Sequence, residues 1–225
     1  MIEEPLPLTF APSIERPPRE LVERLRGAPT SFVVDAMGGS GALDWRIKPI
    51  VGGSLFGVAL TCNCGAGDNL ALIAAAGECE EGDVLVAATG GSTAAAVTGD
   101  LLLGVARNRG AVGFVTDGLV RDFADLEALR MPVYALGLTP NSPGRRGPGT
   151  VGLPIVCGGR AIASGDVIVG DRDGVVAVPR ALIEEMLAAL DRVKEAEAAM
   201  FERVRGGLRE LPVTPAARRA QDASR

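Results

Sequence analysis

Three charged residues have the types and the spacing of a small catalytic or binding site. Asp100 follows Gly99 directly, and twenty residues separate it from the neighbouring pair Arg121 and Asp122. Arginine can grip a carboxylate or an enolate oxygen with its planar fork of donors, whereas a carboxylate can hold a hard cation or move a proton. The three residues could therefore bind an anionic substrate together with a divalent cation.

The backbone around this site offers a second way to bind an anion. The sequence after Gly99 predicts a helix, and the first amides of a helix have no partner within it. The amides of Leu101, Leu102 and Leu103 would then point outward, where they can bind a carboxylate or a phosphate. Gly99 itself would let the backbone come close to such a ligand.

The same residues also have ordinary structural interpretations. Asp122 could cap the helix predicted in RDFADLEALR, with Asp125 at the third position as a weak capping box. Asp100 could be a first-turn acid that interacts favourably with the helix dipole, and Arg121 could pair with either carboxylate. Local sequence alone favours these structural roles, because capping residues are common.

Histidine is absent from the 225 residues. Its absence excludes Ser-His-Asp and Cys-His nucleophiles, imidazole acid–base catalysis and zinc sites built on histidine. Any chemistry must therefore use carboxylates, arginine, lysine, backbone amides, water and a hard metal ion. The four cysteines lack the spacing of a zinc site and are expected to be buried reduced thiols, with Cys62 and Cys64 on one strand face.

An alternation of strands and helices would position Asp100 and Asp122. Continuously apolar runs in GDVLVAATG, AVGFVTDG and MPVYALG predict buried strands, and helices are expected between them. The residues GSTAAAVT before Gly99 are expected to form a loop. This alternation is typical of an α/β core. Both acids would then lie at the carboxyl ends of core strands, where ligand crevices form in open α/β sheets.

The pattern changes beyond residue 140. A basic loop, NSPGRRGPGTVG, precedes short strands separated by Gly-rich turns, and a long helix is predicted to begin near Pro179. The apolar stripe of this helix consists of Ile183, Met186, Leu187, Leu190 and Val193. We expect a single domain, residues 1–225, with a core of about residues 15–206, a strand-rich second layer and a mobile tail at residues 207–225.

Composition and charge limit the classes of binding partner that we expect for the chain. Hydrophobic residues make up 47% and charged residues 23%, which is typical of a globular protein. The net charge of −5 argues against nucleic acid and anionic membranes as main partners. No apolar run reaches the roughly 18 residues of a membrane span, and the acidic, Pro-rich N-terminus is unlike a signal peptide. We therefore expect a cytoplasmic protein that acts on a small molecule.

Six short motifs also occur in an order that carries a family resemblance. They are GDNLAL, GDVLV, GDLL, TDGLVRD, PVYALG and GDVIVGDRDGVVAVP. Together they resemble the family of 4-hydroxy-4-methyl-2-oxoglutarate aldolases and the regulator of ribonuclease activity A, over roughly residues 30–206. The resemblance implies a layered β/β/α sandwich of the swivelling-domain type with a long C-terminal helix, assembled as a homotrimer or a dimer of trimers.

The aldolase branch of this family is similar to the chain in one spacing: an Asp is followed, after twenty intervening residues, by an Arg-Asp pair. In this chain these residues are Asp100, Arg121 and Asp122. This implies a divalent-metal-dependent aldolase that releases pyruvate from 4-hydroxy-4-methyl-2-oxoglutarate or a related 4-carboxy-4-hydroxy-2-oxo acid, and that also decarboxylates oxaloacetate. By the resemblance, Asp122 would hold Mg²⁺ or Mn²⁺ and Arg121 would bind the substrate and stabilise its enolate. The amides after Gly99 would hold the C1 carboxylate, and Asp100 would order a water that takes the 4-hydroxyl proton.

Further positions follow from the same resemblance. Asp35 stands where the aldolase branch has an acid near the site, and Glu197, with Glu195 as the competing choice, stands where a glutamate reaches a neighbouring subunit's site. Independently of the resemblance, Arg145 and Arg146 could meet a distal carboxylate of the substrate, because arginine forks suit carboxylates, or they could simply belong to a solvated loop. Other members of the family regulate a ribonuclease without catalysis, so a non-catalytic regulator and a lyase for another 2-oxo acid are the alternatives.

Overall fold

Four parallel strands form the centre of the main sheet. The computed structural model describes residues 7–211 and places β3 (Leu55–Asn63), β4 (Asp83–Ala88), β6 (Gly113–Thr116) and β8 (Val133–Ala135) side by side in that order. All of β4 and β6 is buried, as their continuously apolar runs predict for strands covered on both faces. The expected α/β core is therefore confirmed.

Further strands extend this sheet at its two edges. At one edge β2 (Lys48–Val51) pairs antiparallel with β8. At the other edge β10 (Gly149–Val151) pairs antiparallel with the end of β3, and β1 (Leu8–Phe10) pairs parallel with β10. The other half of β3 pairs with β13 instead, so the sheet divides at this strand.

A second strand layer covers one face of the main sheet. The hairpin of β13 (Val167–Asp171) and β14 (Gly174–Val178) packs its inward side chains, including Ile168 and Val175, against apolar side chains of β4 and β6. A smaller hairpin, β11 (Ile155–Cys157) and β12 (Arg160–Ile162), completes this layer. This is the strand-rich second layer that the Gly-rich turns predict.

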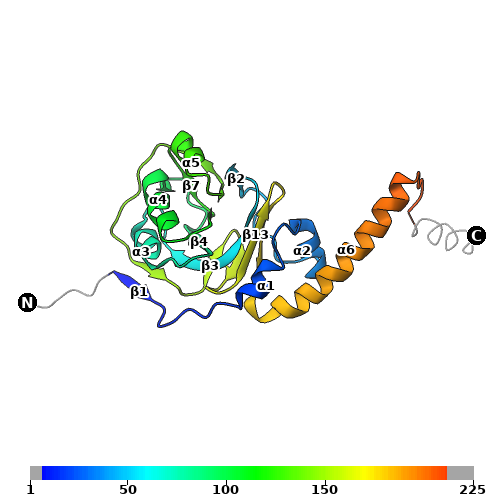
Figure 1. The fold of residues 1–225 in the computed structure, drawn as a ribbon. Helices are drawn as coiled ribbons and strands as arrows, with labels where there is room; N and C mark the ends of the chain where they lie inside the picture. Colours follow the sequence, from blue (N-terminus) through cyan, green and yellow to red (C-terminus); the bar gives the residue numbers. More distant parts are fainter. Residues whose placement is uncertain (1–6, 212–225) are drawn as a thin grey trace, which may run out of the picture.

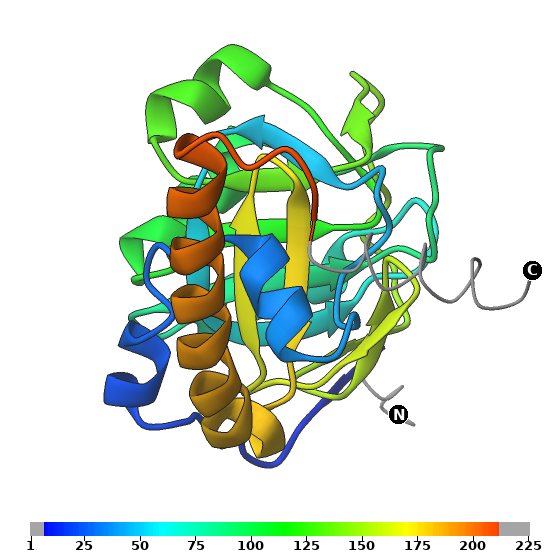
Figure 2. The ribbon, with the colours of Figure 1, turned by 90° about the vertical axis from the view of Figure 1, so that its right-hand side faces the viewer.

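Helices cover the two outer surfaces (Figure 1). One side of the main sheet carries α3 (Leu70–Glu78), α4 (Asp100–Asn108) and α5 (Phe123–Leu129). The outer face of the β13–β14 hairpin carries the other three helices, as Figure 2 shows for α2 and α6. Their bounds are α1 (Arg19–Glu23), α2 (Thr30–Ala36) and α6 (Ile183–Arg205). The β/β/α sandwich with a long C-terminal helix is thus confirmed.

The two halves of α6 differ in their surroundings. Ile183, Met186, Leu187 and Leu190 of the predicted stripe are buried, whereas Val193 is only half-buried. The second half of the helix extends beyond the sheets, and Phe201 is 60% exposed there (Figure 1). Residues 207–211 follow the helix, and residues 212–225 of the predicted mobile tail lie outside the described residues.

A third, very small sheet continues the three parallel strands β4, β6 and β8. Its strands are β5 (Ala96–Thr98), β7 (Leu119–Val120) and β9 (Gly137–Leu138), all parallel. The expectation of a loop before Gly99 was therefore wrong in part, since Ala96–Thr98 is a strand. Strands of two or three residues are too short to show a periodic pattern.

The four cysteines, Cys62, Cys64, Cys79 and Cys157, are free and buried, as predicted. The thiols of Cys62 on β3 and of Cys64, the first residue after that strand, lie 3.9 Å apart. Burial raises the pKa of Cys79 to about 12, and burial likewise raises the pKa of Cys157. Among residues 7–211, no helix has the length and apolar character needed to cross a bilayer.

Arg16 fastens the N-terminal segment to β4. Its Nε and Nη2 donate to the two carboxylate oxygens of Asp83 at 3.0 and 2.8 Å, and its Nη1 lies 3.1 Å from Glu80 Oε1. The Asp83 side chain is only 1% exposed. The hydrogen bonds to Asp83 raise the pKa of Arg16 although burial opposes the charge. Arg16 thus supplies the cation that this buried carboxylate needs.

Replacing Arg16 with alanine should lower the free energy of unfolding by about 3 kcal/mol, because Asp83 would stay buried without its cation. Urea denaturation should show a lower midpoint at an unchanged slope. Arg24→Ala is the matched control, since the 2.7 Å Arg24–Asp191 pair lies on the surface and should contribute little. Equal losses in the two variants would contradict the special role of Arg16.

Candidate functional site

The small third sheet brings the two predicted site segments together. β5 ends at Thr98 and leads into α4, and β7 ends at Val120 and leads through Arg121 and Asp122 into α5. Thr98 is in register with Val120, and the Arg121 amide donates to the Thr98 carbonyl at 3.1 Å. The site therefore lies at the carboxyl end of the small sheet. The prediction that both acids lie at the carboxyl ends of core strands is corrected in one respect, because the short strands β5 and β7 lie between the core strands and the site.

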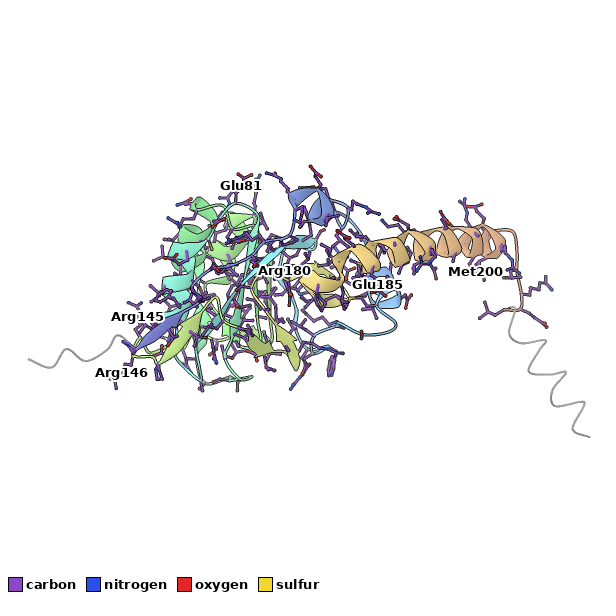
Figure 3. All side chains as sticks on the ribbon, turned by 90° about the horizontal axis from the view of Figure 1, so that it is seen from below. Glu81, Arg145, Arg146, Arg180, Glu185 and Met200 are labelled. Atoms are coloured by element: carbon purple, nitrogen blue, oxygen red, sulfur yellow. The ribbon has the colours of Figure 1, made fainter. Side chains whose placement is uncertain are left out.

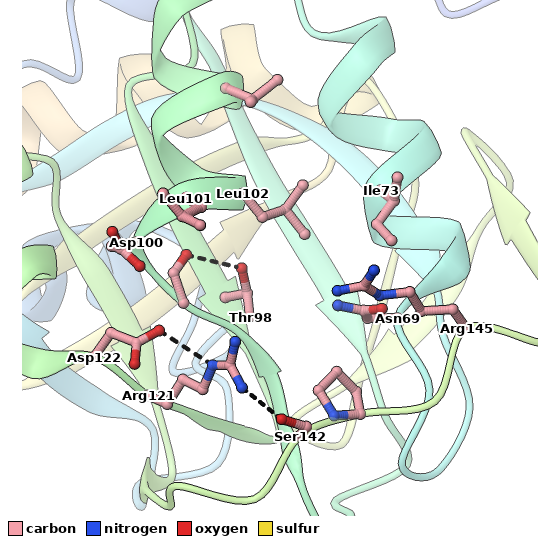
Figure 4. Close-up of a pocket in the computed structure, with 13 residues that line it drawn as sticks. Asn69, Ile73, Thr98, Asp100, Leu101, Leu102, Arg121, Asp122, Ser142 and Arg145 are labelled. Atoms are coloured by element: carbon pink, nitrogen blue, oxygen red, sulfur yellow. Dashed lines mark hydrogen bonds and ion pairs between the residues drawn. The ribbon is translucent and has the colours of Figure 1, made fainter.

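A cavity of about 360 Å³ opens between these segments (Figure 4). Residues from four stretches of the chain line it, and charged groups lie among apolar ones. The lining residues are Asn69, Ile73, Thr98, Gly99, Asp100, Leu101, Leu102, Val105, Arg121, Asp122, Ser142, Pro143 and Arg145. The cavity thus contains every one of the main predicted residues, together with Arg145 of the basic loop.

Arg121 is held in the cavity from two sides. Its Nε donates to Asp122 Oδ2 at 3.1 Å, and its Nη1 donates to Ser142 Oγ at 2.6 Å (Figure 4). Both charged side chains are about one-third exposed, at 35% and 36%. Sequence reasoning missed Ser142, which no local pattern distinguishes from other loop serines. Its hydrogen bond orients the guanidinium while leaving other N–H groups available for a ligand.

Asp122 has a backbone conformation that is unusual for a residue with a side chain. Its φ and ψ are 61° and 47°, in the left-handed region, and it immediately precedes α5. Such a conformation costs on the order of 1 kcal/mol or more. The carboxylate makes no capping hydrogen bond to the helix amides, so the predicted alternative of a capping box with Asp125 is not formed. The side chain contacts Arg121 instead.

Gly99 lies so close to Asp122 that it leaves no room for a side chain. A Cβ atom at this position would lie 2.1 Å from Asp122 Oδ2 and 3.1 Å from Arg121 Cγ. The φ of Gly99 is −143°, which any residue can adopt. The position therefore favours glycine because of the close approach to the Asp122 carboxylate, and not because of its own backbone.

The start of α4 faces the same cavity. Asp100 is the first helical residue and is half-buried, and Gly99 is the residue before the helix. The amides of Leu101 and Leu102 donate to no other group among residues 7–211. The prediction was wrong for Leu103, whose amide donates to the Gly99 carbonyl at 3.3 Å. The Leu101 and Leu102 amides are therefore available to an anion, and the helix dipole would favour its negative charge.

The basic loop forms the opposite wall. Arg145 lines the cavity. The Asp68 carboxylate holds the loop in place, because it accepts hydrogen bonds from the backbone amides of Arg146 at 2.6 Å and Leu70 at 2.9 Å. Burial disfavours the charged form of Asp68, but backbone N–H groups, including those of Arg146 and Leu70, outweigh it and lower the pKa of this carboxyl group. The loop is thus tied to the start of α3.

The structure does not bring Asp35, Glu195 or Glu197 into this cavity. Asp35 lies on α2 and lines a separate hollow together with Trp45. Glu195 and Glu197 are exposed on α6. Figure 3 shows Met200 of α6 at the opposite end of the molecule from Arg145. Within one chain these acids are therefore remote from the site, and their roles stay predictions.

The chemistry of the cavity is that of an anion site beside carboxylates. Arg121, Arg145 and the α4 amides can bind carboxylate groups, and Asp100 and Asp122 can hold a cation or order a water. The described residues contain no cluster of three potential ligands from His, Cys, Asp and Glu. A cation here would consequently be held by one or two carboxylates and by water, as is usual for Mg²⁺.

Comparisons with known proteins agree with this picture. The family model described as RraA-like, Aldolase/RraA, matches residues 30–177, well over half of the chain. A relative from Halalkalibacterium halodurans, provisionally named a 4-hydroxy-4-methyl-2-oxoglutarate aldolase, is 38% identical over 169 residues, which cover 75% of this chain and 80% of the relative.

Two solved structures share the fold. An uncharacterised protein from Pseudomonas syringae pv. tomato has a TM-score of 0.78 at 25% identity, covering 88% of this chain and 93% of the other. The RNA-processing inhibitor RraA from Thermus thermophilis has a TM-score of 0.63 at 29% identity, covering 68% of this chain and 93% of the other. Proteins with the names of an enzyme and of an inhibitor are thus both similar to this chain.

Replacing Gly99 with alanine should displace the Asp122 carboxylate and break its ion pair with Arg121, because the new Cβ would overlap Oδ2. The fold should survive, since the end of a side chain can move at little cost. A crystal structure of the variant would show the displacement, and its melting temperature should stay within a few degrees of the wild type.

Gly104→Ala is the matched control for Gly99→Ala. It also lies on α4, but a Cβ there would meet only Leu129 Cδ2 at 3.8 Å. This variant should keep the Arg121–Asp122 pair and gain about 0.5–1 kcal/mol from the higher helix propensity of alanine. An unmoved Asp122 carboxylate in Gly99→Ala would contradict the steric argument.

Proposed function

Because the chain belongs to the RraA-like Aldolase/RraA family, we propose that it is a divalent-metal-dependent aldolase. The substrate is 4-hydroxy-4-methyl-2-oxoglutarate or a related 4-carboxy-4-hydroxy-2-oxo acid, and oxaloacetate decarboxylation is a side activity. The observation that carries the proposal is that Gly99, Asp100, Arg121 and Asp122 line one cavity. The name of the Halalkalibacterium halodurans relative supports the same reaction.

The groups present fit a hard divalent cation such as Mg²⁺ or Mn²⁺. Asp122 makes no capping hydrogen bond, and its Oδ1 makes no hydrogen bond to another described residue. We propose that Asp122 holds the cation directly, with Asp100 acting through water. When bound, the cation would polarise the 2-oxo group and favour negative charge on its oxygen.

Arg121 and the start of α4 bind the reacting end of the substrate in this proposal. The amides of Leu101 and Leu102 donate to the C1 carboxylate, and the Arg121 guanidinium, oriented by Ser142, stabilises the developing enolate oxygen. Donors fixed in advance in this way need no reorganisation during the reaction. The binding of C1 also directs the remainder of the substrate along the cavity.

Asp100 assists the proton transfers of the cleavage through an ordered water molecule. A water ordered by its carboxylate takes the 4-hydroxyl proton, and the C4–O bond becomes a carbonyl as the C3–C4 bond breaks. The electron pair of that bond moves into the enolate of pyruvate. A proton returned through water to C3 then gives pyruvate, and the C4 fragment leaves as a second oxo acid. Oxaloacetate yields the same enolate when it loses carbon dioxide.

A ribonuclease regulator is the second candidate, supported by the similarity to the RNA-processing inhibitor of Thermus thermophilis. A binding module has no need of the complete Asp100, Arg121 and Asp122 set, which is why the aldolase is preferred. A lyase for another 2-oxo acid would use the same residues. In either enzyme we propose a trimer or a dimer of trimers, in which Glu197 or Glu195 of the exposed part of α6 reaches a neighbouring site.

The decisive experiment measures pyruvate release from a panel of 4-substituted 2-oxo acids. Activity with Mg²⁺ or Mn²⁺ that disappears in EDTA and returns with added metal would support the proposal. Full activity in EDTA would exclude the metal, and inactivity on the whole panel would exclude the reaction class. Capture of a ribonuclease by the inactive protein would then favour the regulator.

Asp122→Asn should weaken metal binding more than it weakens the fold. Asparagine keeps the shape but loses the negative charge, so raising the Mg²⁺ concentration should restore part of the rate. A titration of rate against Mg²⁺ measures the shift. An unchanged Mg²⁺ dependence would show that Asp122 does not hold the cation.

Arg121→Lys should lower kcat about a hundredfold, or by about 3 kcal/mol in activation free energy, because lysine keeps the charge but loses the planar fork. The melting temperature should change little, since the side chain lies on the cavity wall and not in the core. Steady-state kinetics together with thermal denaturation separates the two effects. Wild-type turnover in this variant would contradict the role given to Arg121.

A further inference from the structure

Asn69 is a buried polar residue in the cavity wall with an unused hydrogen-bonding group. It lies directly before α3 and is 6% exposed. Its Nδ2 donates to the Val97 carbonyl at 3.0 Å, which fixes the orientation of the amide. Its Oδ1 is shielded from water and has no hydrogen-bond partner among residues 7–211. An acceptor in this condition needs a donor from elsewhere.

This unpaired acceptor is unusual in the molecule. The only comparable side-chain atom in the described part of the chain is the Tyr134 hydroxyl, which lines none of the cavities described above. The buried carboxylate of Asp117, by contrast, accepts from the Thr89 amide and hydroxyl and from the Gly91 amide. Asn69 therefore combines a missing partner with a place at the ligand cavity.

Arg145 is a donor in the same cavity whose backbone lies beside that of Asn69. The backbone amide of Asn69 donates to the backbone carbonyl of Gly144 at 3.0 Å. This hydrogen bond joins the two segments one residue away from Arg145. Both side chains line the same cavity, which Figure 4 shows in close-up. The Arg145 side chain is exposed and has no hydrogen bond or ion pair to another described residue. It is thus free to turn toward Asn69.

We propose that Asn69 Oδ1 is the acceptor that fixes the Arg145 guanidinium in the cavity, and that the fixed guanidinium binds a second carboxylate of the ligand. A guanidinium has five N–H donors, so one edge can bond the amide oxygen while another grips a carboxylate. Asn69 is then a positioning residue that acts through Arg145. The pair makes the site selective for dicarboxylic over monocarboxylic 2-oxo acids.

This inference deepens the proposed function and rests on it for the placement of C1 at α4 and Arg121. It concerns binding, however, and can be tested without turnover. Suitable probes are 2-oxoglutarate and 2-oxopentanoate, which have the same five-carbon chain but end in a carboxylate and a methyl group respectively. Their dissociation constants, measured by calorimetry with Mg²⁺ present, give a selectivity ratio for each variant.

The wild type should bind 2-oxoglutarate at least tenfold more tightly than 2-oxopentanoate. Arg145→Ala should bring the ratio close to one, and Asn69→Leu should do nearly the same. The double variant should lose no further selectivity, because the two residues act as one unit. Binding of 2-oxopentanoate should change little in all three, since it does not use this end of the cavity.

Asn69→Asp separates positioning from a purely structural role. It loses the donor to Val97, as Asn69→Leu does, but keeps an acceptor for Arg145. Its selectivity ratio should therefore remain near the wild-type value. The inference would be overturned if the Asp and Leu variants lost affinity for both ligands to the same extent. It would also be overturned if Arg145→Ala kept the wild-type selectivity ratio. Should Asn69→Leu fail to fold, Asn69→Ala removes the same acceptor and is judged by the same ratio.

A failure of this inference is distinguishable from a failure of the aldolase proposal. If the wild type releases no pyruvate but shows the expected selectivity ratios, the carboxylate-binding role of Asn69 and Arg145 is supported and the proposed reaction is wrong. If pyruvate is released and the ratio does not respond to substitution of Asn69 or Arg145, the proposed reaction is supported and the role of this pair is wrong.

Discussion

One backbone pairing determines whether the site exists. The small parallel sheet sets Thr98 beside Val120, and the Arg121 amide continues that pairing by donating to the Thr98 carbonyl. Only because these two strand ends are in register do the start of α4 and the Arg121-Asp122 pair face each other. The sheet has two or three residues per strand, so its position depends on β4, β6 and β8, the core strands that precede its three strands in the chain.

Around this pairing, the local structure departs from the most stable arrangement in several ways. Asp122 adopts a left-handed conformation, two amides of α4 lack acceptors, and the side-chain oxygen Oδ1 of Asn69 lacks a donor. Each of these features costs stability. The buried core, with fully covered strands and the Arg16–Asp83 pair, compensates for them. Strain gathered in one cavity on a well-packed support is typical of a functional site.

The sequence predicted the parts of the fold that have long, uniform patterns. The apolar runs of β4 and β6 and the stripe of α6 each extend over enough residues to be recognised. The strands β5, β7 and β9 could not be predicted, because two or three residues carry no period. Local patterns likewise favoured a capping role for Asp122, and only the family resemblance favoured its grouping with Asp100 and Arg121.

Other features of the site depend on contacts between distant loops. Ser142 and Asn69 are ordinary polar residues in the sequence, and their importance follows from hydrogen bonds that form or fail to form after folding. Asp35 and Glu197 show the reverse case, in which a residue suggested by resemblance lies away from the cavity of its own chain. A pattern read along one chain cannot give contacts made between loops or between copies.

The burial of the four cysteines has a practical consequence for chemical labelling. Thiol reagents attack the thiolate, and burial both hides these sulfur atoms and, with a pKa of about 12 at Cys79, keeps that thiol protonated. A cysteine introduced at an exposed position such as Phe201 on α6 would ionise near pH 8.5. A single fluorophore or spin label could then be attached there selectively, without removing any native cysteine.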